Sequence, residues 1–280
     1  MGLTVYTPAS YGNGQRLPVL YFLHGRSGDE NIMYELDIRN IADRMISESL
    51  IKPLIIVCPR MENSRGLNSA EECHDVVSTD GRMINLGRYE DYFIKEIMTF
   101  VDGHYNTWSH RNGRFIGGVS AGGYAALNLG MRYPDLFSRI GGHMPAVELQ
   151  LDEEDMPYFK DMDMWRANNP LLTAAKCSLG SDCKIYLDAG DEDEVGFYNG
   201  CLRLYETLNT RGIDVQNHIF KGHHNMEYIK SNIEKYIAFY GSLHAEDNFP
   251  SAIICAAHDA ATFNNAANNR QKTGKEHSTP

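Results

Sequence analysis

The sequence predicts an α/β fold in which a mostly parallel sheet is covered by helices on both faces. Two near-continuous apolar runs, at residues 19–23 and 54–58, are typical of strands buried on both faces. A strand-like segment at 114–116 leads through a glycine-rich turn into a helical pattern, as a strand followed directly by a helix does. Strands and helices alternate from there to about residue 240.

Each element has its own signal in the sequence. The run at 19–23 ends at a His-Gly pair, and the run at 54–58 lies between two prolines. Apolar residues at helical spacing between 90 and 105 indicate an amphipathic helix. Further strands are expected at 114–116, 140–142, 184–188 and 218–220, and further helices after residue 120, at 197–211 and at 225–240.

Two segments interrupt this alternation. Residues 144–180 are acidic, rich in methionine and aromatic residues, and without a clean period, which predicts a lid or substrate-facing insertion. Residues 245–280 are polar and predict a disordered tail. The expected folded domain is therefore 1–244, one large domain rather than two.

Composition excludes several classes of function. The net charge of −11 argues against nucleic acid or an anionic membrane as partner, because both need a basic face. No run approaches the length of a membrane span, and the first twenty residues show no signal peptide. We therefore expect a cytoplasmic protein as the chain stands, or a secreted one if a signal peptide was removed. The six cysteines form no metal-binding spacing, so no metal is expected, and Cys177 and Cys183 are expected to be reduced although they could pair.

The glycine-rich turn carries the main functional signal, a Gly-x-Ser-x-Gly pattern centred on Ser120. A serine on a sharp strand-to-helix turn has a strained backbone and exposes its hydroxyl at the carboxyl end of the strand. Glycines flank it because a Cβ would clash in so tight a bend. The alternative is an ordinary βα turn with an incidental serine. The strand before and the helix after favour a nucleophile at Ser120.

A serine hydroxyl needs an adjacent base, usually a histidine oriented by a carboxylate. With this motif the chain order is serine, acid, histidine, each at the carboxyl end of a strand. His223 and His224 follow the expected strand that ends at residue 220, whereas His218 lies within it and is expected to be structural. The acid should follow the strand at 184–188, where 188–194 offers five carboxylates; order alone chooses neither the acid nor the histidine.

The oxyanion of an acyl-transfer intermediate needs two backbone N–H donors that already point at it. The residue after the nucleophile, Ala121, should supply one of them. The loop at 24–28, after the first buried strand, should supply the other, with His24 bracing that loop.

Several motifs together resemble the putative-esterase family of α/β-hydrolases, which contains feruloyl and acetyl-xylan esterases, S-formylglutathione hydrolases, siderophore esterases and mycolyltransferases. The similarity runs from about residue 5 to 240 and is greatest to the feruloyl-esterase branch. It implies the α/β-hydrolase fold, although members generally have one or two strands before the segment at 5–8. The motifs are Tyr-Phe-Leu-His-Gly at 21–25, Gly-Val-Ser-Ala-Gly-Gly-Tyr at 118–124, Arg-Tyr-Pro-Asp-Leu-Phe at 132–137 and Gly-His at 222–223.

The resemblance implies roles for particular residues. Members usually carry their acid three residues after the glycine that ends the strand, which implies Asp193, with Asp191 as the fallback. Their base directly follows a glycine and has an aromatic residue five positions on, which implies His223 with Tyr228 rather than His224. Tyr228 stands where members usually have tryptophan, on the alcohol side of the pocket. Arg26 is implied as the partner of Ala121 in the oxyanion hole.

The resulting expectation is a serine carboxylesterase without a cofactor, acting on a small-molecule or carbohydrate ester, with a feruloyl, cinnamoyl or acetyl group most favoured. The insertion would line the acyl pocket with residues that include Met156, Tyr158 and Trp165; ordinary packing of these side chains is the alternative. Other hypotheses are an acyltransferase or an S-formylglutathione-type thioesterase on the same triad, and a non-catalytic binding protein on a hydrolase scaffold. The oligomeric state is left open.

Overall fold

The computed structural model describes residues 2–242. The tail expected at 245–280 lies outside the described residues. Within the described part, no helix has the length and apolar character that crossing a bilayer requires.

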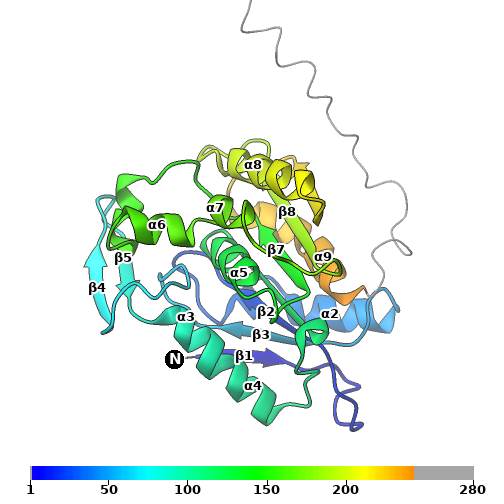
Figure 1. Cartoon of the computed structure of the whole chain (residues 1–280). Helices are drawn as coiled ribbons and strands as arrows, with labels where there is room; N and C mark the ends of the chain where they lie inside the picture. The colour runs from blue at the N-terminus through cyan, green and yellow to red at the C-terminus, as the bar shows by residue number, and fades with distance from the viewer. Residues whose placement is uncertain (1, 243–280) are drawn as a thin grey trace, which may run out of the picture. The chain divides into compact units, whose positions relative to one another are not determined.

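The centre of the fold is a seven-stranded sheet in the order β1-β3-β2-β6-β7-β8-β9 (Figure 1). β1 pairs antiparallel with β3, and the other five pairs of neighbours are parallel. The carboxyl ends of the parallel strands therefore meet at one edge, where loops can bring distant residues together. The strands are β1 (Leu3–Tyr6), β2 (Val19–Leu23), β3 (Ile55–Pro59), β6 (Arg114–Val119), β7 (Arg139–His143), β8 (Lys184–Gly190) and β9 (Asp214–Phe220).

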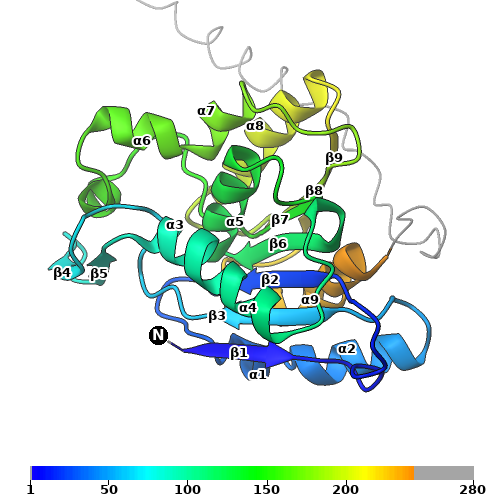
Figure 2. The same ribbon diagram turned by 60° about the horizontal axis from the view of Figure 1, so that its bottom comes forward.

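Helices cover both faces of this sheet (Figure 2). One face packs against α4 (Met98–His104), α5 (Ala121–Arg132) and α8 (Phe197–Thr210). The other packs against α1 (Ile32–Glu35), α2 (Ile38–Ser47) and α9 (Met226–Gly241). Three short helical segments complete these layers: α3 (Tyr89–Asp91) and the π-helical η1 (Tyr92–Ile97), which lead into α4, and the 3-10 turn η2 (Arg111–Gly113) before β6.

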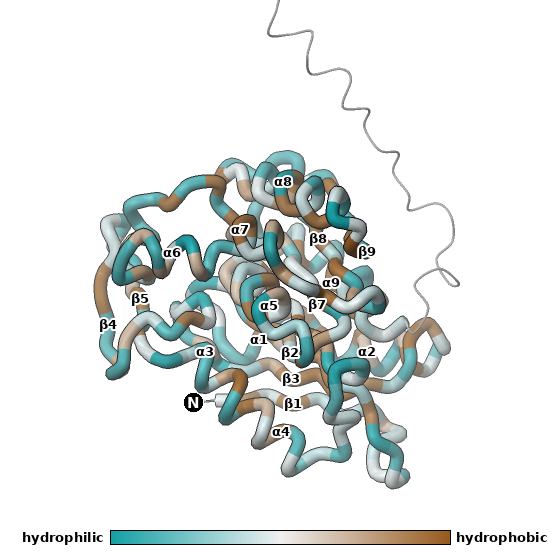
Figure 3. The backbone as a smooth tube through the Cα atoms, in the orientation of Figure 1, coloured by the Kyte–Doolittle hydropathy of each residue, from teal (hydrophilic) through white to brown (hydrophobic). Residues whose placement is uncertain are grey.

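Successive side chains of each central strand point alternately to the two faces of the sheet. Val19, Tyr21 and Leu23 of β2 lie in one core cluster, whereas Leu20 and Phe22 lie in the other. Since side chains alternate across a strand, a run buried on both faces has to be apolar at every position. The tube in Figure 3 is accordingly brown along much of the central strands.

A smaller layer lies beside the sheet, where two segments far apart in the sequence pack together (Figure 1). One is the hairpin of β4 (His74–Val77) and β5 (Met83–Leu86). The other is the insertion between β7 and β8, which contains the 3-10 helix η3 (Glu153–Tyr158) and helices α6 (Met162–Asn168) and α7 (Pro170–Ala174). Ile84, Leu86, Tyr158 and Phe159 form the core that these segments share.

The predicted mostly parallel sheet with helices on both faces is confirmed. The predicted strands and the later helices lie within a few residues of the observed ones. The sequence analysis did not foresee the β4–β5 hairpin. Its first strand is largely exposed and carries no alternating apolar pattern, so it gives no strand signal.

Candidate active site

Ser120 occupies the sharp turn between β6 and α5. Its φ of +52° is in a region that side-chain-bearing residues rarely adopt, and its N–H donates to the His143 carbonyl at 3.0 Å. The turn is tight because α5 starts directly above the end of β2: a Cβ on Gly122 would lie 2.4 Å from the carbonyl oxygens of both Leu23 and His24. This backbone holds the Ser120 side chain at the carboxyl edge of the sheet.

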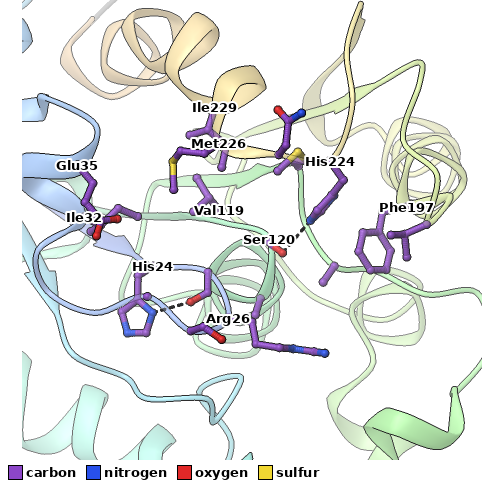
Figure 4. Close-up of a pocket in the computed structure, with 18 of the residues that line it drawn as sticks. His24, Arg26, Ile32, Glu35, Val119, Ser120, Phe197, His224, Met226 and Ile229 are labelled. Atoms are coloured by element: carbon purple, nitrogen blue, oxygen red, sulfur yellow. Dashed lines mark hydrogen bonds between the residues drawn. The ribbon is translucent and has the colours of Figure 1, made fainter. Parts of the chain in front are cut away.

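His224 faces this serine. The Nε2 atom of His224 lies 2.9 Å from Ser120 Oγ, a hydrogen-bond distance (Figure 4). His224 precedes Asn225, which caps α9 by accepting a hydrogen bond from the Tyr228 N–H at 3.0 Å. The Phe197 ring packs edge-on against the imidazole, with ring centroids 4.9 Å apart. Helix cap and aromatic contact together fix the imidazole beside the hydroxyl.

Asp193 completes the arrangement. Its Oδ1 accepts hydrogen bonds from the N–H groups of Val195 and Gly196, at 2.9 and 3.3 Å, which leaves Oδ2 facing His224. The Oδ2–Nδ1 distance of 3.4 Å is longer than a standard hydrogen bond. Burial raises the pKa of Asp193, but the facing imidazole and the two amides outweigh it and hold that pKa below its usual value.

The structure corrects the expectation that His223 faces the serine. The side chain of His223 is half exposed and turns to Glu192, at 3.1 Å, and Glu194, at 2.6 Å. Hydrogen bonding to Glu194, helped by its charge, raises the pKa of His223. The His223 carbonyl accepts the Asn225 N–H at 2.9 Å, so the backbone turns at His224 and the two imidazoles point in different directions. The glycine-histidine motif thus indicated the loop that approaches Ser120, but the histidine that contacts the hydroxyl is His224, one residue further along.

Asp191, the fallback acid, has a different contact. Its Oδ1 accepts a hydrogen bond from the Gly222 N–H at 3.0 Å. The Asp191 N–H in turn donates to the Phe220 carbonyl. Asp191 thus joins the loop after β8 to the loop after β9, whereas Asp193 lies beside the imidazole.

Ser120 and His224 lie in a cavity of about 410 Å³. The expected oxyanion residues Arg26 and Ala121 both line it. Figure 4 shows Met226 and Ile229 on one side of Ser120 and Arg26 on the other. Ile32 extends the apolar side, where Glu35 lies beside it (Figure 4). The Arg26 side carries the paired charges of Arg82 and Glu154, whose side chains lie 2.9 Å apart. The cavity thus has a mostly apolar face and a charged face.

The four expected substrate-binding residues do not line this cavity. Tyr158 is buried against the Arg65 guanidinium, and the Tyr228 hydroxyl donates to the buried Asp188 at 2.7 Å. Trp165 packs onto the small core between the insertion and the hairpin, while Met156 is 53% exposed outside the cavity. Tyr158 and Trp165 thus pack within the insertion, as the packing alternative expected, whereas Tyr228 packs in the core under α9.

Sequence reasoning missed the apolar face. Met226 and Ile229 are one helical turn apart at the start of α9, and Ile32 starts α1. Apolar side chains three residues apart also occur on every core-facing helix, so this signal alone does not distinguish a pocket from a core. No sequence signal separates His224 from His223, because both lie in the same short loop before the Asn225 cap. Residues 2–242 contain no cluster of three or more His, Cys, Asp or Glu side chains that could hold a metal ion.

The sheet order, the strained serine turn and the neighbouring histidine and aspartate are those of an α/β-hydrolase. Residues 1–240 match the family model described as "Putative esterase". The chain belongs to this family.

Individual relatives are more distant. An acetyl esterase of Caldicellulosiruptor saccharolyticus is 26% identical over 248 residues, which cover 81% of this chain and 82% of that protein. An esterase of Mycobacterium tuberculosis (strain H37Rv) is 27% identical over 152 residues, 54% of this chain but only 30% of the relative's length. The solved structure of a ferulic acid esterase superposes with a TM-score of 0.69 at 20% identity, over 85% of this chain and 91% of that one.

Proposed function

We propose that the chain is a serine carboxylesterase in which Ser120 is the nucleophile, His224 the general base and Asp193 the residue that orients the base. The observation that carries the proposal is the 2.9 Å contact between Ser120 Oγ and His224 Nε2 on a strained strand-to-helix turn. A base within this distance can accept the hydroxyl proton as the oxygen attacks. Asp193, with one oxygen bound by two amides, suits a fixed acceptor for the Nδ1 proton.

The reaction then runs by acyl transfer to water. Ser120 Oγ bonds to the ester carbonyl carbon while its proton moves to His224 Nε2, and the carbonyl oxygen becomes an oxyanion that the amides of Arg26 and Ala121 bind. The intermediate collapses, the bond to the alcohol oxygen breaks, and His224 gives the proton to the departing alcohol. A water molecule attacks the acyl-enzyme with His224 again as base, which releases the acid and restores the serine.

The two faces of the cavity suit a substrate ester in which an apolar acyl group is joined to a hydroxyl-rich alcohol. Met226, Ile229 and Ile32 offer an apolar surface beside Ser120, whereas Arg82 and Glu154 offer hydrogen bonds to hydroxyl groups. A feruloyl, cinnamoyl or acetyl ester of a carbohydrate fits this description. The names of the acetyl esterase and ferulic acid esterase relatives point to the same substrates.

Two measurements test the proposal. A fluorophosphonate probe should label the wild-type chain at Ser120 and leave Ser120→Ala unlabelled, because the probe reacts with an activated serine. Methyl ferulate, p-nitrophenyl acetate, longer acyl esters and S-formylglutathione should then be compared as substrates. Labelling with hydrolysis of methyl ferulate supports the esterase. Labelling with turnover of S-formylglutathione alone would replace it by a thioesterase, and an unlabelled wild type would refute catalysis at Ser120.

A further inference from the structure

A buried carboxylate connects the insertion to the loop that carries Arg26. Asp155 lies in η3 and is 1% exposed. Its Oδ1 accepts a hydrogen bond from Arg26 Nη2 at 2.8 Å, and its Oδ2 accepts one from Arg65 Nη2 at 2.5 Å. Both oxygens are thus bound, each by an arginine from a different loop at the carboxyl edge of the sheet.

Arg65 gives this carboxylate a fixed position. The Arg65 side chain is 1% exposed, and Glu148 binds two of its nitrogens at 2.7 and 3.1 Å. Its guanidinium lies 5.0 Å from the Tyr124 ring and 5.2 Å from the Tyr158 ring. Tyr124 belongs to the first turn of α5, and its N–H donates to the Ser120 carbonyl at 2.9 Å. Asp155 is therefore held, through Arg65, in a constant position relative to the nucleophile.

The backbone of the Arg26 loop is fixed on either side of Arg26. The His24 ring contacts the Gly25 carbonyl at 2.7 Å and accepts a hydrogen bond from the Met61 N–H at 2.9 Å. Ser27 has a φ of +63°, and its N–H donates to Asn63 at 2.6 Å. The Arg26 side chain itself is held by Asp155, at 2.8 Å. The direction of the Arg26 N–H follows from these three restraints.

We propose that Asp155 is a positioning residue for the oxyanion hole: it holds the Arg26 side chain so that the Arg26 N–H points at the oxyanion. This inference rests on the proposed function, since it requires that Ser120 attacks the ester and that the Arg26 N–H binds the resulting oxyanion. Asp155 does not line the cavity, so it would act on the oxyanion through Arg26 rather than by direct contact. Loss of the restraint should weaken binding of the transition state more than binding of the substrate.

Asp155→Asn is the direct variant, because it keeps the volume and removes the charge. We expect kcat to fall by about 10- to 100-fold, less than complete loss of an oxyanion donor costs, with KM within about threefold. An arylboronic acid, which forms a tetrahedral anionic adduct with the serine, should lose affinity by a similar factor. A purely structural role would lower the melting temperature without this split between kcat and KM.

Glu148→Gln is the matched control. It removes the other carboxylate from the same Arg65 but does not touch Arg26. Its kcat should stay within about threefold of wild type, even if both variants lose stability. Arg26→Met, which removes the guanidinium and keeps the amide, should reproduce the kcat loss of Asp155→Asn. It serves as the second variant if Asp155→Asn does not fold. In the Arg26→Met background, Asp155→Asn should add little further loss.

The outcomes separate this inference from the proposed function. Wild type and Ser120→Ala are assayed first, and absence of Ser120-dependent hydrolysis would overturn both proposals. If wild type is active, equal kcat for Asp155→Asn and Glu148→Gln, multiplicative losses in the double variant, or a raised KM at unchanged kcat would each overturn the positioning role alone.

Discussion

The chain contains two His–Asp pairs with the same spacing and different surroundings. His224 Nδ1 lies 3.4 Å from Asp193 Oδ2, and His143 Nδ1 lies 3.4 Å from Asp188 Oδ1. The first pair borders the cavity that holds Ser120. The second is fully buried at the ends of β7 and β8. Residue types and spacing are therefore insufficient to identify a catalytic pair.

The two pairs differ in the partner of the other imidazole nitrogen, Nε2. His224 Nε2 faces the Ser120 hydroxyl, whereas His143 Nε2 faces the Tyr240 hydroxyl at 2.8 Å inside the core. Burial lowers the pKa of His143, which therefore stays neutral. Its backbone carbonyl still accepts the Ser120 N–H. The buried His143 thus supports the serine turn through its backbone, whereas the imidazole of His224 borders the cavity and contacts the Ser120 hydroxyl.

The largest expected effect separates the two adjacent histidines. His224→Ala should lower kcat by about four to six orders of magnitude, because it removes the base that contacts Ser120. His223→Ala, the matched control, should stay within about threefold of wild type, because its partners are Glu192 and Glu194. Steady-state hydrolysis of one ester at one pH is the measurement. A reversal of the two losses would restore His223 as the base.

The next effect compares the acids of the two loops. Asp193→Asn should lower kcat by about 10³- to 10⁴-fold, because the amide no longer selects the imidazole tautomer that the reaction needs. Asp191→Asn should cost less than about tenfold in kcat, since Asp191 bonds to Gly222 rather than to a histidine. Comparable kcat values for the two variants would remove Asp193 from the triad.

For the two His–Asp pairs, the effects on stability should be ranked opposite to the effects on kcat: substitution in the buried pair should cost more stability and less activity. Asp188 accepts hydroxyl hydrogen bonds from Tyr228 and Tyr236, at 2.7 and 2.8 Å, inside the core. Asp188→Asn should therefore lower the free energy of unfolding by about 2–4 kcal/mol, while kcat well below the melting temperature stays within about tenfold. Asp193→Asn should lower the free energy of unfolding by about 1 kcal/mol. Urea titration of both variants measures the contrast, and similar losses would contradict it.

The smallest effect is a pH dependence of stability. The pKa of His143 is lowered in the fold, while in the unfolded chain it is about 6.5. As the pH falls below about 6.5, the unfolded chain binds a proton that the folded chain does not, so stability falls. At pH 5 the loss from His143 reaches at most about 2 kcal/mol. Burial also lowers the pKa values of His24 and His218, which adds loss in the same direction.

Urea titrations at pH 7 and pH 5 measure this effect, together with the number of protons taken up on unfolding. The raised pKa of exposed His223 acts in the opposite sense, since its contribution is lost as the pH rises. His223→Ala should therefore make the decrease at low pH larger, not smaller. A stability that stays constant or increases between pH 7 and pH 5 would contradict the burial of a neutral His143.

The sequence predicted the features that short-range patterns determine. Apolar runs such as 19–23 must be buried strands, and a serine between Gly118 and Gly122 must lie on a tight turn. The order of the strands indicated the two loops that the structure brings to Ser120, after β8 and after β9. The offset of Asp193 from Gly190 came from the family resemblance, and the structure brings that residue to the imidazole.

The sequence did not predict which way side chains point from irregular loops. His223 and His224 are equivalent as residue types, and only the hydrogen bonds of Glu192, Glu194 and the Asn225 cap separate them. The sequence also did not predict the ion cluster around Arg65, because its members are distant in sequence and meet only in the folded chain. Pocket residues such as Ile229 use the same helical spacing as core residues.

The central claim is that Ser120 and His224 act as one catalytic unit, and the combination of their two substitutions tests it most directly. We predict that Ser120→Ala/His224→Ala has a kcat/KM for the best ester of the panel within about threefold of the weaker single variant, because either substitution alone disables the unit. If the double variant falls to the uncatalysed rate while both singles stay well above it, or if either single keeps a tenth of wild-type kcat/KM, the two residues act independently and the account is wrong.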